Sequence, residues 1–277
     1  MAKEEHAVSC NFETLFLKNV PHILEKILFS LDYKSFKECL RVSSVWNKQL
    51  KSAALIARAK SAFAEEIMEE QSRLVDASEE ENLEEIKDLL SSGMLDVDCV
   101  VGTYTHSGYI TPLQVSAQCG NSDAVQILLD KGADPDKAEL DEYGPLHMAA
   151  LMGYKDVVKM LLDAGANPNK EAGEGNTALL VAAEKECKEV AKVLLEGGAD
   201  PNVAQVDNGR WTALHHAAYE GDIEMVQLLV DYGADPDAED ENGETALHFA
   251  RDMEHCAVIG LLNNLGSWRI QKCSCCN

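Results

Sequence analysis

The chain has 277 residues, 46% of them apolar, which allows one large domain or a small domain followed by a medium one. Its 48 acidic residues outnumber the 24 basic ones, for a formal net charge of −24, and all of this acidic excess follows Val75. Such a field repels phosphate backbones, so sequence-independent nucleic-acid binding is excluded and a basic or apolar protein partner is favoured.

Residues 1–14 are predicted to be a flexible N-terminus without the apolar core of a signal peptide. No run of residues approaches the roughly 18 apolar positions of a membrane span. Six cysteines lie singly along the chain with no CxxC pair among them, which indicates reduced thiols in a cytoplasmic or nuclear protein. They are Cys10, Cys39, Cys99, Cys119, Cys187 and Cys256.

Residues 15–55 contain two amphipathic helical runs that no other part of the chain repeats. Val20-Pro21 starts the first run, and Asp32 marks the break before the second. About 35 residues do not easily build a core of their own, so their apolar side chains imply docking on something else. The apolar faces consist of Ile23, Leu24, Ile27, Leu28 and Leu31 in the first run, and Phe36, Leu40, Val42, Val45 and Trp46 in the second.

The stretch from Val20 to Trp46 resembles the F-box, a three-helix module. The resemblance rests on Val20-Pro21, Ile27-Leu28, Leu31-Asp32, Val42-Ser43 and Trp46, with Val20 and Ser43 where that family usually has Leu and Cys. It implies docking on the Skp adaptor of a cullin-RING ubiquitin ligase, through Pro21, Leu24, Ile27, Leu28, Leu31, Val42 and Trp46. Docking of the same helices on the chain's own repeats remains an alternative.

Residues 56–75 are predicted to be a helical connector, and residues 76–266 repeat themselves. The motif positions Thr111, Gly144, Thr177, Thr212 and Thr245 follow one another at steps of 33, 33, 35 and 33 residues. A Gly-Ala-Asp or Gly-Ala-Asn turn lies 21 residues after each of the first four. These features resemble the ankyrin repeat. We therefore expect an all-α protein, a three-helix module followed by a solenoid of about six repeats whose helix pairs are joined by β-hairpin fingers.

Each repeat buries its apolar stripe only against a neighbouring repeat, so the terminal repeats should be atypical. The stripe is represented by Val157-Val158-Leu161-Leu162, and the last repeat has Glu254 where other repeats carry a mid-repeat glycine. Gly144 stands where a capping Thr is usual, so the third repeat is expected to be less stable by about 1 kcal/mol.

The eight histidines do not indicate catalysis or metal binding. His147, His215 and His248 share one motif position, where a ring nitrogen can bind the finger backbone. No phosphate loop, serine elbow, paired carboxylates or calcium loop is present. We therefore expect a protein that is not an enzyme and needs no cofactor and no metal.

In the ankyrin family, the fingers and the exposed ends of the first helices form the binding face. The equivalent positions here carry aromatic and apolar side chains, and roughly half of these rings are expected to pack on adjacent fingers. They are Tyr104, Tyr109, Ile110, Tyr143, Leu151, Met152, Trp211 and Tyr219. Rings flanked by carboxylates suit a target protein with a basic segment. The flanking carboxylates are Asp141, Glu174, Glu184, Glu220, Glu241, Glu244 and Asp252.

Residues 267–277 form a cysteine-rich tail that ends in Cys-Ser-Cys-Cys-Asn. Ser274 stands where four-residue prenylation requires Cys, but the double cysteine resembles some Rab-type tails. Lipidation of Cys273, Cys275 or Cys276 would add a membrane association, and three thiols without a function are the alternative. The sequence thus favours a substrate receptor of an SCF-type ubiquitin ligase, with an ankyrin scaffold or inhibitor as the runner-up.

Overall fold

The computed structural model describes residues 31–42, 59–102, 109–139, 142–206 and 209–265. The flexible N-terminus, most of the F-box-like module and the tail with its three candidate lipidation cysteines lie outside these residues. Two compact units are present. The first comprises the chain up to Arg73 and residues 87–96, and the second comprises residues 74–86 and the chain from Val97 onward.

The first unit is built around α3 (Tyr33–Val42) and the N-terminal part of α6 (Ala64–Glu79). Asp32 precedes α3 and accepts a hydrogen bond from the Ser35 backbone N–H at 2.8 Å, as a capping residue does. The ring of Phe36 is buried and lies 5.5 Å from the ring of Phe63. The Tyr33 ring lies 5.4 Å from the same ring. Aromatic packing therefore fixes one face of α3 within its own unit.

α6 ends in a turn that leads into α7 (Leu83–Ser91). Glu81 has a positive φ of 56° at this turn, and the Asn82 N–H donates to the Ala77 carbonyl. Gly120 has the same conformation at the equivalent turn, where the Asn121 N–H donates to the Ser116 carbonyl. The end of α6 thus takes the place of the first helix of a repeat in which the sequence indicated only the second helix.

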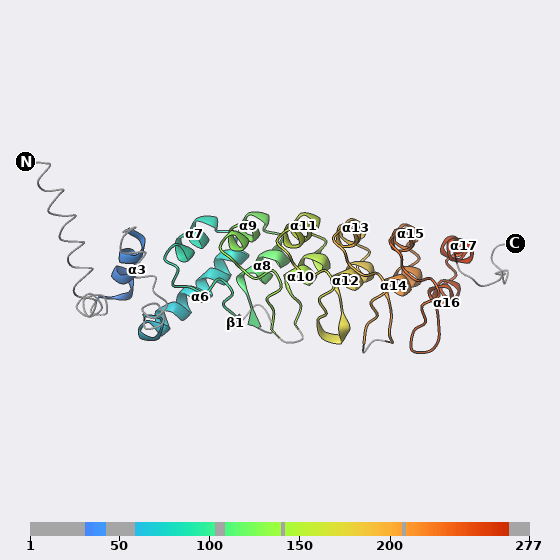
Figure 1. Ribbon diagram of the computed structural model, residues 1–277, viewed down its shortest axis with the longest axis horizontal. Helices are drawn as coiled ribbons and strands as arrows, with labels where there is room; N and C mark the ends of the chain where they lie inside the picture. The colour runs from blue at the N-terminus through green and yellow to red at the C-terminus, as the bar shows by residue number, and fades with distance from the viewer. Residues whose placement is uncertain (1–30, 43–58, 103–108, 140–141, 207–208, 266–277) are drawn as a thin grey trace, which may run out of the picture. The chain divides into compact units, whose positions relative to one another are not determined.

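Helix pairs follow at the predicted period and occupy two layers of the second unit (Figure 1). The first helices lie side by side in one layer, the second helices lie in the other, and the fingers extend from the first-helix layer on its far side (Figure 1). The five pairs in residues 109–265 are α8 (Pro112–Cys119) and α9 (Ser122–Asp130), α10 (Pro145–Met152) and α11 (Lys155–Asp163), α12 (Ala178–Glu184) and α13 (Lys188–Glu196), α14 (Ala213–Glu220) and α15 (Ile223–Asp231), and α16 (Ala246–Asp252) and α17 (Cys256–Leu265).

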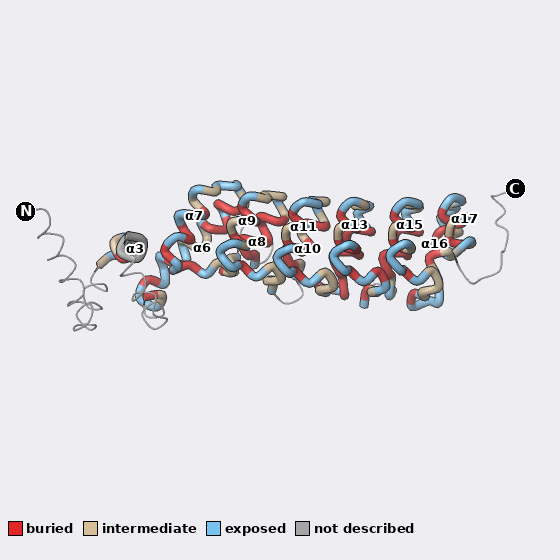
Figure 2. The backbone as a smooth tube through the Cα atoms, turned by 45° about the horizontal axis from the view of Figure 1, so that its top comes forward, coloured by how far each residue is buried: buried red, intermediate tan, exposed pale blue. Residues whose placement is uncertain are grey.

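The core of this unit lies between the layers and between successive pairs. Figure 2 shows buried residues on the sides of the helices that face other helices, with exposed residues on the outer sides. Val157, Val158 and Leu161 are buried as predicted, and Leu162 is half-buried. Small residues such as Ala149 and Ala217 are buried in the first helices, which lets neighbouring helices approach closely.

Side-chain hydrogen bonds of Asp and Asn join the starts of successive fingers. Asp98 accepts from the Asp134 N–H, Asp136 from the Asn167 N–H, and Asn169 from the Asp200 N–H, at 2.7–3.0 Å. Asn202 repeats the contact with Asp235 at 2.8 Å. The Gly-Ala-Asp/Asn-Pro-Asp/Asn signature therefore encodes a ladder between repeats in addition to a turn.

The first finger contains the antiparallel pair β1 (Val101–Gly102) and β2 (Tyr109–Ile110). Two later fingers each contain a single bridge, Ala172 with Asn176 around the short helix η1 (Gly173–Gly175), and Ala204 with Thr212. Within the described part of the chain, no helix has both the length and the apolar character of a membrane span.

Candidate protein-binding surface

The finger surface, meaning the fingers and the C-terminal ends of the first helices, is held in place by the capping motif that recurs along the chain. The Thr212 N–H donates to His215 Nδ1 at 3.0 Å, so the ring proton is on Nε2, which donates to the Ala238 carbonyl of the next finger at 3.1 Å. His248 accepts from the Thr245 N–H in the same way. The structure thus confirms the predicted role for His215, which connects a helix start to the backbone of the next finger.

Gly144 breaks this pattern in the third repeat. His147 Nε2 still lies 3.0 Å from the Asn176 carbonyl of the next finger, but its Nδ1 is buried and has no hydrogen-bond partner among the described residues. Burial lowers the pKa of His147, which keeps the ring neutral. The expected loss of the cap is therefore visible as one unsatisfied ring nitrogen.

Leu180 replaces the motif histidine in the fourth repeat, and a buried polar chain takes over the connection. Gln205 Nε2 donates to Asn176 Oδ1 at 2.6 Å, and His216 Nε2 lies 3.3 Å from Gln205 Oε1. Burial lowers the pKa of His216 to about 4, although the nearby Glu184 carboxylate opposes the shift. These hydrogen-bonded side chains connect two fingers to α14 without an ionised group.

Trp211 is the centre of an aromatic cluster at the finger that precedes α14. Its ring lies 4.6 Å from Phe249 on α16, 5.0 Å from His216 and 5.5 Å from Tyr219. Trp211 is half-buried, whereas Tyr219 at the end of α14 is 38% exposed. Three rings therefore hold Trp211 in one orientation and leave part of the cluster open to a partner.

The predicted target-binding residues differ in exposure. Tyr109, Met152 and Tyr219 are exposed by 65%, 49% and 38%, while Tyr143 and Leu151 are half-buried. Tyr104 lies outside the described residues. The Tyr143 ring stacks on the His147 ring at 5.4 Å, so it packs on a helix of its own repeat, whereas the sequence predicted packing on adjacent fingers.

The prediction that Ile110 contacts a target is wrong, because its side chain is only 3% exposed. It packs in a core cluster with Val75 and Val115. Tyr109 and Ile110 are adjacent in β2, where successive side chains point to opposite faces, so only one of them can be on the finger surface.

Most of the predicted carboxylates are on the finger surface. Glu174, Glu184, Glu220, Glu241 and Asp252 are exposed, Glu244 is half-buried, and Asp141 lies outside the described residues. Burial and the carboxylates of Glu184 and Glu174 raise the pKa of Tyr143. The acidic field predicted for this surface therefore acts on at least one of its rings.

Three residues of the finger surface were missed. Val206 is 65% exposed in the finger beside η1, and Phe249 completes the Trp211 cluster. Met253 is 43% exposed and lies eight residues after Thr245, as Met152 does after Gly144. The counting rule that identified Met152 would have found Met253, whereas nothing local in the sequence marks Phe249 as a neighbour of Trp211.

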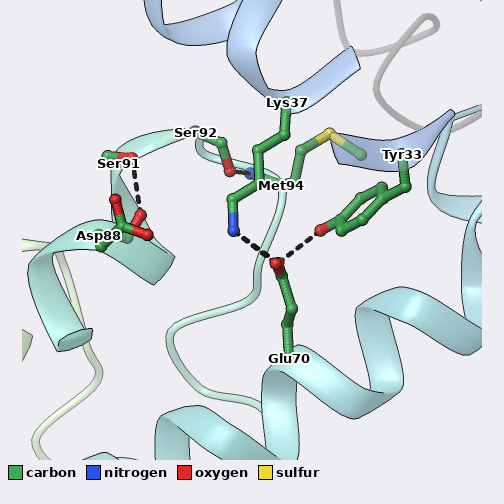
Figure 3. A network of polar contacts seen from close by, with 7 residues as sticks. All are labelled: Tyr33, Lys37, Glu70, Asp88, Ser91, Ser92 and Met94. Carbon is green, nitrogen blue, oxygen red and sulfur yellow. Dashed lines mark hydrogen bonds and ion pairs between the residues drawn. The ribbon is translucent and has the colours of Figure 1, made fainter. Parts of the chain in front are cut away.

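Five of the seven predicted adaptor contacts lie outside the described residues, namely Pro21, Leu24, Ile27, Leu28 and Trp46. Leu31 is half-buried, and Val42 is the last residue of α3. The described face of α3 contains a polar network that the sequence did not indicate (Figure 3). Lys37 Nζ donates to both Glu70 oxygens at 2.7 Å, and the Tyr33 hydroxyl donates to Glu70 Oε2 at 2.6 Å.

Comparison with known proteins gives a family and several partial relatives. A family model described as Ankyrin repeats (3 copies) matches residues 74–172, 145–205 and 181–267, which together make up more than half of the chain. Protein phosphatase 1 regulatory subunit 27 of Mus musculus and of Homo sapiens are each 44% identical over 57 residues, 21% of this chain and 37% of the relative. Potassium channel AKT3 of Oryza sativa subsp. japonica is 48% identical over 44 residues, 16% of this chain and 5% of the channel. The chain thus spans well under two thirds of these relatives.

Proposed function

This chain belongs to the ankyrin-repeat family, whose role is protein binding, and we propose that it is the substrate-recognition subunit of an SCF-type cullin-RING ubiquitin ligase. In this proposal the repeats bind a target protein through the finger surface. The F-box-like segment docks on the Skp adaptor, which connects the chain to the cullin scaffold. The protein works in the cytoplasm or the nucleus.

The observation that carries the proposal is the non-repeating segment from Val20 to Trp46, with its F-box-like order and spacing. The structure adds support from α3, the described part of that segment. Tyr33, Phe36 and Lys37 of α3 are buried, in contact with the ring of Phe63 and the carboxylate of Glu70. These ring contacts and the ion pair would fix the docking segment relative to the connector more firmly than a flexible attachment would.

Such a subunit works by proximity. Binding the adaptor with one segment and a target with another converts transfer of ubiquitin into a reaction between tethered groups, which raises the effective concentration of the target lysine. The ubiquitin-conjugating machinery supplies the chemistry, so the chain itself contributes no catalytic residue. The histidines of the motif position are occupied by structural hydrogen bonds, in keeping with this division of roles.

Co-purification of the full chain with the Skp adaptor tests the proposal. We expect the wild type to retain the adaptor and the variant Ile27→Ala/Leu28→Ala to lose it while its unfolding midpoint stays near that of the wild type. Met152→Ala, which removes an exposed side chain of α10, is the matched control and should retain the adaptor. If the wild type retains no adaptor under conditions in which its repeats are folded, the ligase role is rejected.

A second candidate function is that of a regulatory scaffold unconnected to ubiquitin. The similarity to protein phosphatase 1 regulatory subunit 27 favours it, since that relative's name describes a subunit that regulates a phosphatase. Binding of the purified full chain to the phosphatase 1 catalytic subunit, measured beside adaptor binding, separates the two. Phosphatase binding without adaptor binding would select the scaffold.

The lipidation of Cys273, Cys275 or Cys276 stays a prediction. It would place the receptor at a membrane surface without changing what the repeats bind. Mass spectrometry of the C-terminal peptide from native cells is the direct measurement, and recovery of only unmodified peptide would reject it.

A further inference from the structure

One part of the finger surface, around α14 and α16, combines a cluster of rings with carboxylates. We call it the Trp211 patch and define it by Trp211, Tyr219, Phe249, Glu220, Glu241 and Asp252. The rings are in mutual contact through Trp211, with centroid distances of 4.6 Å to Phe249 and 5.5 Å to Tyr219. The carboxylates come from α14, the following finger and the end of α16.

Glu241 lies beside Trp211. Its N–H donates to the Gly209 carbonyl at 2.9 Å, which joins two fingers. A Cβ at Gly209 would be 3.8 Å from Glu241 Oε1 and 3.2 Å from the Trp211 ring, so carboxylate and indole approach the same point in space. Glu220 follows the exposed Tyr219 directly at the end of α14, and Asp252 takes the position equivalent to Tyr219 at the end of α16.

The carboxylates of the patch are available for a partner. Glu184, one repeat away, is paired with Lys185 at 2.7 Å, whereas Glu220, Glu241 and Asp252 form no ion pair with any residue that the structure describes. The nearest cations in the sequence, Arg210 and Arg251, are fewer than the carboxylates. An aromatic face rimmed by unneutralised carboxylates attracts a cation both through the ring quadrupole and through charge.

We propose that the Trp211 patch anchors a basic segment of the target through one arginine or lysine side chain, whose cation lies against Tyr219 and Trp211 and faces Glu220, Glu241 and Asp252. The inference rests on the proposed function only in taking the repeats as the target-binding part. Apolar neighbours of the cation in the target would contact the exposed Met253 at the end of α16.

Selection from peptide libraries tests this proposal. The probe is a set of 12-residue peptide libraries, randomised except for a central residue fixed as arginine, citrulline, leucine or glutamate, presented to the full chain at physiological salt. We expect enrichment from the arginine library and about tenfold weaker binding when the selected peptide carries citrulline, a neutral isostere. Equal retention of the leucine or citrulline libraries would overturn the proposal in favour of an apolar partner.

Three variants then locate the site with the selected arginine peptide. Tyr219→Leu keeps an apolar side chain without the ring face, and Glu220→Gln/Asp252→Asn removes two charges; each should weaken binding about tenfold. The control Asp163→Asn/Glu196→Gln makes the same change in net charge at exposed positions ending α11 and α13, and should change the affinity less than twofold. An equal loss of affinity in both double variants would mean that the peptide is attracted only by the net charge of the protein, and it would overturn the proposed site.

Neither step uses the adaptor, so the two proposals fail separately. Peptide selection by a chain that binds no adaptor rejects the ligase role and keeps the patch. Adaptor binding by a chain that selects no arginine peptide does the reverse.

Discussion

Lys37 on α3 and Glu70 on α6 form an ion pair at 2.7 Å in which both side chains are largely buried, with exposed fractions of 8% and 15%. The Tyr33 hydroxyl donates to the same carboxylate at 2.6 Å (Figure 3). This network ties the described part of the F-box-like segment to the connector. A buried pair is costly to break because the remaining charge loses its partner.

Glu70→Leu should therefore destabilise the attachment of α3 by about 3 kcal/mol. Hydrogen exchange of the α3 peptides measures this directly, as a local loss of protection. The triple variant Tyr33→Phe/Lys37→Met/Glu70→Leu removes every polar partner together and should recover most of the protection. If the single variant leaves α3 as protected as in the wild type, the network does not hold the helix.

Gly144→Thr should raise the free energy of unfolding by about 1 kcal/mol. The backbone at Gly144 has φ −71° and ψ 173°, close to the capping threonines, and a new Cβ would stay 3.7 Å or more from its neighbours. The hydroxyl would supply the partner that His147 Nδ1 lacks, as Thr212 does for His215 at 2.9 Å. Urea unfolding measures the gain. Gly144→Ala fits the same space without the hydroxyl. An equal rise in the free energy of unfolding for this variant would show that the hydroxyl does not cap the helix.

Glu186→Gly should also stabilise the chain, by about 1 kcal/mol, because Glu186 has a positive φ of 55° that favours glycine. Glu189, an exposed residue within α13, provides the opposite control. Glycine at Glu189 should destabilise by a similar amount, since it loosens a regular helix. The thermal unfolding midpoints of the two variants should thus shift in opposite directions. Shifts in the same direction would contradict backbone strain at Glu186.

Acid should destabilise the repeats through His216. Burial lowers its pKa from 6.5 to about 4. Between these two pH values the His216 ring is therefore protonated in the unfolded chain but neutral in the folded chain. Stability is therefore complete above pH 6.5 and falls by roughly 3 kcal/mol as the pH approaches 4. His147 and His215 act in the same direction. Urea unfolding of His216→Gln between pH 7 and 5 should show a flatter decline than the wild type, and parallel declines would exclude His216 as a cause.

The periodic part of this fold is predictable from sequence because a solenoid repeats its local rules. The Thr or Gly start of each first helix, the mid-repeat turn and the motif histidine all recur at fixed spacing, and residues such as His215 make the contacts that their position implies. The first helix of the first repeat was not recognised because α6 lacks the capping motif. The turn after α6 was also missed because Glu81 has a positive φ, a conformation that a glycine such as Gly120 suggests from sequence but a glutamate does not.

The finger surface was harder to predict than the helices. Counting from the motif predicts positions but not side-chain directions, so it places both Tyr109 and Ile110 on the surface, although the two residues point to opposite faces of β2. Phe249 was missed because its contact with Trp211 crosses from one repeat to the next. Local pattern thus places residues on the surface, while contacts between repeats decide which rings are free.

Hydrogen exchange of the full chain with and without purified Skp adaptor tests the central claim most directly. The account predicts new protection in peptides covering Val20 to Trp46, with the finger surface from Tyr109 to Met253 unchanged and still open for a target. Protection confined to the finger surface, with Val20 to Trp46 exchanging as fast as in the free chain, would contradict it.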